Sequence, residues 1–215
     1  MVAVQVLLSM AMIIFSFVGG FLLFYFTSSL AKTKKKEQMN EMINQLINLV
    51  LFIWLGKIVL NLSTFIQDPI AILAYPADSS AFYFGTILTI AIIVYKGIRQ
   101  RTSISQFVFA FIPVFIVASF LYEFMQIVWG NMGFTWHEIG LLGGLLLVYM
   151  LIHDHVSEEL STLLLVVGWG VGKLLLFWFL PFTTVFGYMI NGWFIVLIVS
   201  ILSVYNGLLY RKRVS

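Results

Sequence analysis

The chain of 215 residues is 61% hydrophobic and only 10% charged, and its mean hydropathy is +1.04. Because soluble domains carry about 25% charged residues, this composition excludes a soluble domain and indicates a single integral membrane domain over residues 1–215. The basic residues behind the net charge of +3 gather at the ends of apolar segments, which disfavours nucleic acid as a partner, and the absence of cysteine excludes disulfides, thiolate metal sites and cysteine nucleophiles.

Seven apolar segments follow one another along the chain, and their lengths are close to those that cross a bilayer as helices. The runs are continuous, whereas a transmembrane β-barrel needs short segments of alternating polarity. The expected fold class is therefore all-α, an integral membrane protein with seven transmembrane helices and no soluble domain. The predicted spans cover residues 3–27, 44–65, 81–96, 104–128, 138–152, 160–180 and 188–209.

The first segment, Val2–Phe26, has the position of a signal peptide. However, no positive charge precedes it, it is longer than the apolar core of a typical signal peptide, and its basic cluster follows it. Lysine and arginine next to a span mark its cytoplasmic end. We therefore expect a first spanning helix with the N-terminus outside.

Ten of the twelve lysines and arginines lie in clusters that follow the first, third and seventh spans. With the N-terminus outside, these clusters and the C-terminus all fall on the cytoplasmic side, as the positive-inside rule requires. The outer loops at 67–80, 129–136 and 181–187 then carry no basic residue. The clustered residues are Lys32, Lys34, Lys35, Lys36, Lys96, Arg99, Arg101, Arg211, Lys212 and Arg213.

The two remaining lysines, Lys57 and Lys173, lie inside apolar runs, as does Glu123. Each lysine is about thirteen residues into an outward-running span, or about 20 Å from its inner edge at 1.5 Å per residue. Because a charge there costs at least a few kcal/mol, we expect the three groups to share one polar cavity in the outer half of the membrane. Two cations against one carboxylate would suit an anionic lipid head group. The plainer alternative is that one lysine pairs with Glu123, or extends to the interface, and only ties helices together.

Two other groups of polar residues have a functional and a structural interpretation. His137 and Glu138, at the outer start of the fifth span, have the chemistry of an acid–base pair, but a hydrated interfacial pair is the commoner arrangement. The inner loop His153–Glu159 contains metal-binding side chains, but a solvated loop is the commoner outcome. We therefore predict neither a metal site nor a cofactor. Five tryptophans fall mostly near outer boundaries, as in an aromatic belt: Trp54, Trp129, Trp136, Trp178 and Trp193.

The second and third spans resemble the prolipoprotein diacylglyceryl transferases over residues 48–88, NLVLFIWLGKIVLNLSTFIQDPIAILAYPADSSAFYFGTIL. Gly56-Lys57 stands where that family has Gly-Arg, Asp68–Ile72 matches its Asp-Pro-x-x-Ile run, and residues 81–85 fall on its Ser-Phe-His-Gly-Gly signature. The similarity continues through SQFVFAFIPVFIVASFLYEF, LLLVVGWGVGKLLLFWF and NGWFIVLIVSILSVYNGLLYRKR. The topology of the family, seven helices with the N-terminus outside and the C-terminus inside, agrees with the one predicted from charge.

Several functional positions of the family carry other side chains here. The signature histidine falls on Tyr83, the later essential arginine on Lys173, and the asparagine of the lipid-binding signature on Glu123. The extracytoplasmic head of the family is reduced to about residues 129–136. Three further positions, where the family has a carboxylate, an arginine and a tyrosine, fall on Gln106, Phe120 and Trp169 and would line the pocket.

The family transfers a diacylglyceryl group from phosphatidylglycerol to a lipobox cysteine, which needs a base for the thiol and cations for the phosphate. The resemblance implies that Lys57 and Lys173 bind the phosphate, as point charges without the bidentate fork of arginine. Tyr83 is a poor base at neutral pH, so Glu123 is the candidate to replace the histidine. If the chain is catalytic, the resemblance thus assigns catalysis to Glu123 and Tyr83.

Three functions follow as hypotheses. The first is a relative in the bacterial cytoplasmic membrane that binds an anionic, phosphatidylglycerol-like phospholipid, lacks the transferase activity, and acts with a lipoprotein or a membrane partner subunit. The second is an active transferase with a rearranged site. The third is a small transporter or channel subunit, which is disfavoured because the sequence shows no internal repeat and no inward-facing polar path.

Overall fold

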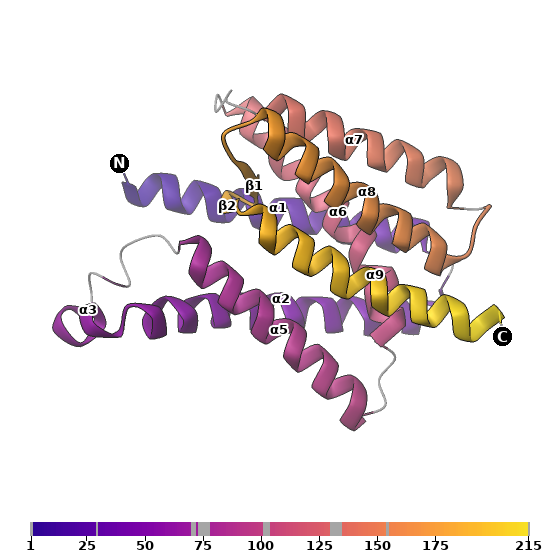
Figure 1. The fold of residues 1–215 in the computed structure, drawn as a ribbon, viewed down its shortest axis with the longest axis horizontal. Helices are drawn as coiled ribbons and strands as arrows, with labels where there is room; N and C mark the ends of the chain where they lie inside the picture. Colours follow the sequence, from indigo (N-terminus) through magenta and orange to yellow (C-terminus); the bar gives the residue numbers. More distant parts are fainter. Residues whose placement is uncertain are drawn as a thin grey trace. The chain divides into compact units, whose positions relative to one another are not determined.

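The computed structural model describes residues 2–28, 30–69, 72, 78–100, 104–129, 135–153 and 155–214. Helices form nearly all of this part of the chain, so the expected all-α fold class is confirmed, with one short β-hairpin before the last helix (Figure 1). The elements are α1 (Val2–Thr27), α2 (Lys32–Leu60), α3 (Leu62–Gln67), α5 (Ser79–Gln100), α6 (Ile104–Val128), α7 (Thr135–Ile152), α8 (Glu158–Phe179), β1 (Thr183–Val185), β2 (Tyr188–Ile190) and α9 (Gly192–Val214).

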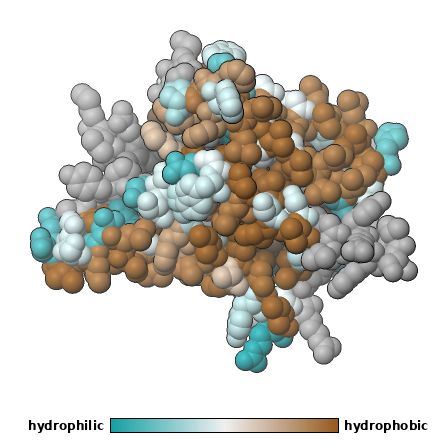
Figure 2. Space-filling model, viewed as in Figure 1, coloured by the Kyte–Doolittle hydropathy of each residue, from teal (hydrophilic) through white to brown (hydrophobic). Residues whose placement is uncertain are grey.

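Five of the described helices, α1, α2, α5, α6 and α8, are long and apolar enough to cross a membrane. Two shorter apolar stretches, Trp136–Ile152 and Gly192–Tyr205, lie in α7 and α9. Apolar side chains cover much of the coloured surface (Figure 2), and Trp178 is 86% exposed. Apolar surface of this extent is typical of helices that face lipid. The chain is therefore a helical, membrane-embedded protein.

Three predicted boundaries differ from the structure. The lysines at 32–36 do not lie in a loop but form the first turns of α2, because lysine is a good helix former and the helix continues past the apolar segment. The second span does not reach residue 65, since α2 ends at Leu60 and the separate helix α3 follows. The loop at 181–187 leads into a hairpin, and α9 begins only at Gly192. Outside the described residues lie Arg101, Asp154, Ile70 and Ala71, and the same holds for the side chains of Arg211, Lys212 and Arg213.

The chain divides into two compact units: unit 1 is Met1–Ala31 with Val108–Ser215, and unit 2 is Lys32–Phe107. In unit 2, α2 and α5 approach each other closely through glycine. A Cβ on Gly85 would lie 2.8 Å from the backbone nitrogen of Ile53. Membrane helices approach this closely where small residues leave room for the facing backbone.

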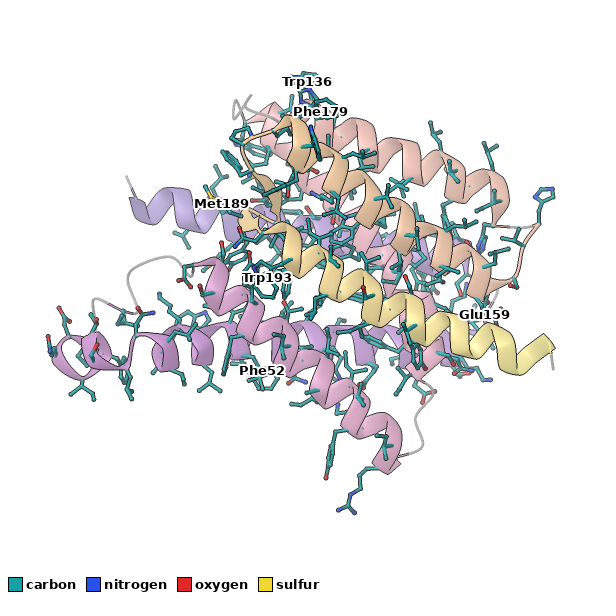
Figure 3. The ribbon with its side chains drawn as sticks, in the orientation of Figure 1. Phe52, Trp136, Glu159, Phe179, Met189 and Trp193 are labelled. Atoms are coloured by element: carbon teal, nitrogen blue, oxygen red, sulfur yellow. The ribbon has the colours of Figure 1, made fainter. Side chains whose placement is uncertain are left out.

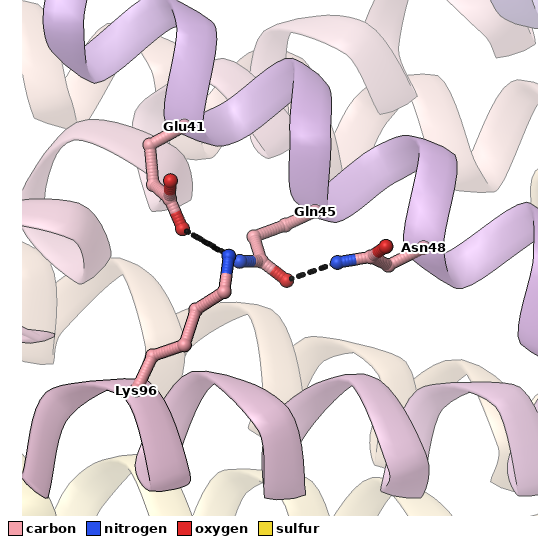
Figure 4. Close-up of polar contacts among 4 residues, drawn as sticks. All are labelled: Glu41, Gln45, Asn48 and Lys96. Atoms are coloured by element: carbon pink, nitrogen blue, oxygen red, sulfur yellow. Dashed lines mark hydrogen bonds and ion pairs between the residues drawn. The ribbon is translucent and has the colours of Figure 1, made fainter. Parts of the chain in front are cut away.

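Polar side chains join α2 and α5 nearer the start of α2 (Figure 4). Lys96 Nζ lies 3.4 Å from Glu41 Oε1, and Gln45 donates a hydrogen bond to the same oxygen at 2.6 Å. Asn48 in turn donates to Gln45 Oε1 at 3.2 Å, and Gln45 is buried. Lys96, which the sequence identifies only as a topology signal, therefore also pairs two helices.

Unit 1 contains α1, most of α6, α7, α8, the hairpin and α9. Its helices also approach closely at glycines. A Cβ on Gly20 of α1 would lie 2.8 Å from the Val114 carbonyl oxygen of α6, and one on Gly170 of α8 would overlap Val199 of α9. Fully buried apolar side chains between these helices form the core of the unit, and they include Val114, Ile116, Leu142 and Ile195.

The hairpin of unit 1 turns at Phe186 and Gly187. Val185 of β1 is opposite Tyr188 of β2, so the turn has two residues, and their φ angles are +49° and +83°. Two positive φ angles match a type I′ turn, which suits the twist of a hairpin. Glycine adopts this conformation freely, but for phenylalanine it costs about 1–3 kcal/mol and persists only where the surroundings hold it. Burial raises the pKa of Tyr188 above its ordinary value, so this phenol stays neutral.

The tip of the hairpin is held by aromatic rings from two helices. The Phe186 ring contacts Phe17 of α1 with the ring centroids 5.0 Å apart. It also contacts Phe115 and Tyr122 of α6 edge to face, at 5.8 Å and 5.5 Å. Edge-to-face pairs of this kind stabilise beyond the area that they bury. The hairpin thus folds back among the helices, where protein groups rather than lipid surround its backbone.

Candidate functional site

A buried ion pair lies at the centre of the candidate site in unit 1. Lys173 of α8 donates a hydrogen bond from Nζ to Glu138 Oε2 of α7 at 2.5 Å, and the two side chains are 3% and 4% exposed. The expectation of a hydrated interfacial pair of His137 and Glu138 is wrong, because only His137 is exposed. Charges so far removed from water need good geometry and further hydrogen bonds.

The hairpin provides the second contact of the lysine. Lys173 Nζ donates to Thr184 O in β1 at 2.6 Å. An ammonium has three N–H donors, so one remains without a partner in the described part of the chain. Lys173 lies near the end of α8 and Glu138 in the first turn of α7, where the helix dipole favours a negative charge. We call this end of unit 1, where α8 ends and α7 begins, the hairpin end.

Glu123 of α6 is the third charged residue at this position. It is 6% exposed, and it lies in the last turns of α6. Lys173 attracts its carboxylate and Glu138 repels it, but no described residue forms a hydrogen bond with it. We call Lys173, Glu138 and Glu123 the charged cluster. If both carboxylates are ionised, the cluster has one unmatched negative charge, whereas buried charges in proteins are normally paired.

Four buried polar atoms without a hydrogen-bond partner among the described residues belong to the charged cluster, precede one of its members by one helical turn, or neighbour Thr184 in sequence. They are Ser119 Oγ, Glu138 Oε1, Trp169 Nε1 and Thr183 Oγ1. Ser119 precedes Glu123 by one helical turn, and Trp169 precedes Lys173 by one turn, so each shares a helix face with a charged residue. Unsatisfied buried polar atoms are rare in native proteins. Several of them beside one ion pair indicate a place for a polar ligand.

Of the predicted pocket residues, Trp169 and Phe120 belong to unit 1. Trp169 packs edge to face on Phe115 with the centroids 5.7 Å apart, and Phe115 in turn contacts the hairpin tip. Phe120 packs toward α7, where a Cβ on Gly143 would lie 3.4 Å from its ring. Trp169 is therefore linked through Phe115 to the hairpin, and Phe120 to the neighbouring helix.

Lys57, Tyr83 and Gln106 belong to unit 2. Lys57 is half-buried within one turn of the end of α2, so it does not lie in the middle of a span. It is attracted by Asp78, whose Oδ1 accepts a hydrogen bond from Ala81 N at the start of α5. Tyr83 is buried in α5, and Gln106 is exposed in α6. The two carboxylates that interact with Lys173, Glu138 and Glu123, both belong to its own unit.

The acidic residues in the first turn of α8 have a structural role. Ser157 Oγ accepts a hydrogen bond from Leu160 N, and Glu158 and Glu159 lie in the first turn, where the helix dipole favours carboxylates. His153 stacks on Tyr149 with the centroids 4.9 Å apart. Among the residues that the structure describes, no group of three histidine, aspartate or glutamate side chains could hold a metal ion.

Exposed aromatic residues surround the hairpin end of unit 1. Trp136 begins α7, Phe179 ends α8 and Trp193 begins α9, and each is more than half exposed (Figure 3). Glu159 marks the opposite end of α8. Tryptophan is enriched where a membrane meets water. The positions of these rings therefore support a membrane interface at the hairpin end, with the charged cluster about one to two helical turns below it.

Sequence reasoning identified Lys173 and Glu123 but missed Glu138 and Thr184 as the partners of the lysine. Glu138 is 35 residues away on another helix, and the carbonyl of Thr184 carries no sequence signal. The available signal was position: Glu138 begins one apolar helix and Lys173 nears the end of the next, so antiparallel neighbours bring them together.

No protein-family model, no curated protein and no solved structure matches the chain.

Proposed function

We propose that this chain is a multi-pass membrane protein that binds the head group of a phospholipid at the charged cluster. The observation that carries the proposal is the buried Lys173–Glu138 pair next to buried donors that have no partner among the described residues. Charged groups within membrane helices are rare and usually functional. A phospholipid brings a charged phosphate to a site in the membrane without leaving the bilayer.

The free hydrogen-bonding groups support a phosphate as the ligand. The third N–H of Lys173, the indole N–H of Trp169 and the hydroxyl of Ser119 are all donors. The oxygens of a phosphodiester accept hydrogen bonds, and bonds to a charged acceptor are about twice as strong as neutral ones. The anionic, phosphatidylglycerol-like lipid expected from the sequence is one candidate, and its charge requires that one carboxylate of the cluster is neutral.

The proposal includes a binding role without diacylglyceryl transfer, in a bacterial cytoplasmic membrane, with a lipoprotein or a membrane protein as partner. Tyr83 stands where the transferase family that the sequence resembles carries its signature histidine, and a phenol is a poor base at neutral pH. In the active alternative, Glu123 would be the base that takes the proton of the thiol.

Lipid retention by the purified protein tests the proposal. Native mass spectrometry should find phospholipid bound to the wild type and to Lys32→Met, which removes an exposed lysine of α2. Ser119→Ala and Trp169→Phe remove single donors without unpairing a charge, and each should lower occupancy about tenfold, as expected for one lost hydrogen bond to a charged group. Equal occupancy in all variants would contradict phosphate binding at the cluster.

An activity assay separates the alternatives. The chain is mixed with phosphatidylglycerol and a lipobox peptide, and the lipidated peptide is measured. We expect no turnover. Turnover that is lost in Glu123→Gln would replace the binding role by the active transferase, and ion or solute flux into proteoliposomes would support the transporter or channel.

A further inference from the structure

We infer that the lipid bound at the charged cluster carries an ammonium group beside its phosphate, and that Glu123 receives this ammonium. The inference rests on the proposed function and names the class of head group, an amine-bearing phosphodiester. Its starting point is a charge count. Lys173, Glu138 and Glu123 are each more than nine-tenths buried, and they comprise one ammonium and two carboxylates.

The counter-charges, rather than the hydrogen bonds, distinguish the two carboxylates. Glu138 Oε2 accepts from Lys173 at 2.5 Å and balances its charge, while Glu138 Oε1 has no hydrogen-bond partner among the described residues. Glu123 accepts no hydrogen bond from the described residues, although it lies close enough to sense both neighbours electrostatically. A ligand with only a phosphate would bring the cluster to three negative groups against one positive group. A ligand with a phosphate and an ammonium leaves one unmatched charge, as before binding, and gives Glu123 a partner of opposite sign.

The order of the groups along the helices matches such a ligand. Ser119 and Trp169 are one turn further from the hairpin end than Glu123 and Lys173, which is about 6 Å along a helix. The two donors without partners therefore lie deeper in the membrane, and the carboxylates lie nearer the interface. In an aminophospholipid the phosphate is next to the acyl chains and the amine is further out. A lipid with its tails toward the bilayer centre would thus meet donors with its phosphate and Glu123 with its ammonium.

Other head groups fit this arrangement less well. The glycerol hydroxyls of phosphatidylglycerol can donate to Glu123, but they bring no positive charge. The trimethylammonium of phosphatidylcholine brings the charge but has no N–H to donate. Only a primary ammonium supplies both to a buried carboxylate, and for such a group the loss of a charged hydrogen bond corresponds to about a tenfold change in binding.

Competition between three lipids with the same acyl chains tests the inference. The full-length protein is equilibrated in mixed micelles with equal amounts of phosphatidylethanolamine, phosphatidylglycerol and phosphatidylcholine, and the bound lipids are counted by native mass spectrometry. We expect the ethanolamine lipid to be preferred about tenfold over each of the others. Glu123→Gln should remove most of this preference, because the amide that replaces the carboxylate carries no charge to pair with the ammonium. Glu158→Gln, at an exposed carboxylate in the first turn of α8, should leave the preference intact.

The outcomes distinguish this inference from the proposed function. Equal binding of the three lipids by the wild type, or a preference for phosphatidylglycerol, would overturn the ammonium site and leave phosphate binding in place. Occupancy that is unaffected by Ser119→Ala and Trp169→Phe would overturn the proposed function itself. If Glu123→Gln does not fold, the ranking of lipids by the wild type still decides between an ammonium and a hydroxyl.

Discussion

Lys173 is held by partners from two different elements, a carboxylate of α7 and a carbonyl of the hairpin. Each partner does something different. Glu138 matches the charge, and Thr184 O, which belongs to the backbone, fixes the direction of the side chain. Because Lys173 is only 2% exposed, water cannot replace either of them. The pair therefore couples two helices and the hairpin through a single nitrogen.

Removing one member of the pair should be much more harmful than removing both. Lys173→Met leaves the carboxylate of Glu138 buried without a counter-charge, so we expect a loss of about 3–5 kcal/mol in the free energy of unfolding. The double variant Lys173→Met with Glu138→Leu should recover most of that loss. Equilibrium unfolding in detergent with a chemical denaturant measures both effects. Glu138→Leu is measured alone as well. If the loss in the double variant equals the sum of the losses in Lys173→Met and Glu138→Leu, the pair is not coupled as described.

Among the elements, the close crossing of α2 and α5 leaves no room for a larger residue. A Cβ on Gly85 would lie 2.8 Å from the backbone nitrogen of Ile53, which cannot move away without shifting α2. We expect Gly85→Ala to lower the thermal unfolding temperature clearly, by an overpacking cost of about 1–3 kcal/mol.

The matched control for this change is Gly144→Ala, in the middle of α7. A Cβ there meets nothing within 4 Å, and alanine favours a helix by about 1 kcal/mol over glycine. Its unfolding temperature should therefore stay the same or rise. Similar losses at Gly85 and Gly144 would show that the close crossing at Ile53 is not the cause of the loss at Gly85.

The sequence predicts the helices well because each apolar run is as long as a span and basic residues mark its end. It predicts less of what breaks the pattern. The hairpin turn Phe186–Gly187 lacks the Asn-Gly or Asp-Gly signal of such turns, and its conformation depends on rings of α1 and α6 that are remote in sequence. In the same way, the charge of Lys173 is visible in the sequence, while its pairing with Glu138 depends on which helices become neighbours.

For the whole molecule, the seven-span topology is a prediction that single-cysteine labelling can check, because the chain contains no cysteine. With the N-terminus outside, Asp68→Cys and Pro181→Cys should react with a membrane-impermeant maleimide in intact cells. Thr33→Cys and His155→Cys should react only after the membrane is opened. All four positions are exposed in the structure, so a failure to react reflects the side of the membrane and not burial. Labelling of Thr33→Cys in intact cells would show that the orientation is opposite to the predicted one.

The aromatic contact between Phe17 and Phe186 sets an order of events during synthesis. α1 is made before the hairpin, and its Phe17 ring has no Phe186 to contact until residues 183–190 have left the ribosome. Lys173 likewise enters the membrane before Thr184 has been made. Contacts between such distant parts of a chain form late, so the hairpin docks only after α1, α6, α7 and α8 have been made. A nascent chain that stops before the hairpin would leave Lys173 without its contact to Thr184 O and Phe17 without its contact to Phe186. Both groups would then be exposed to the quality-control machinery of the cell.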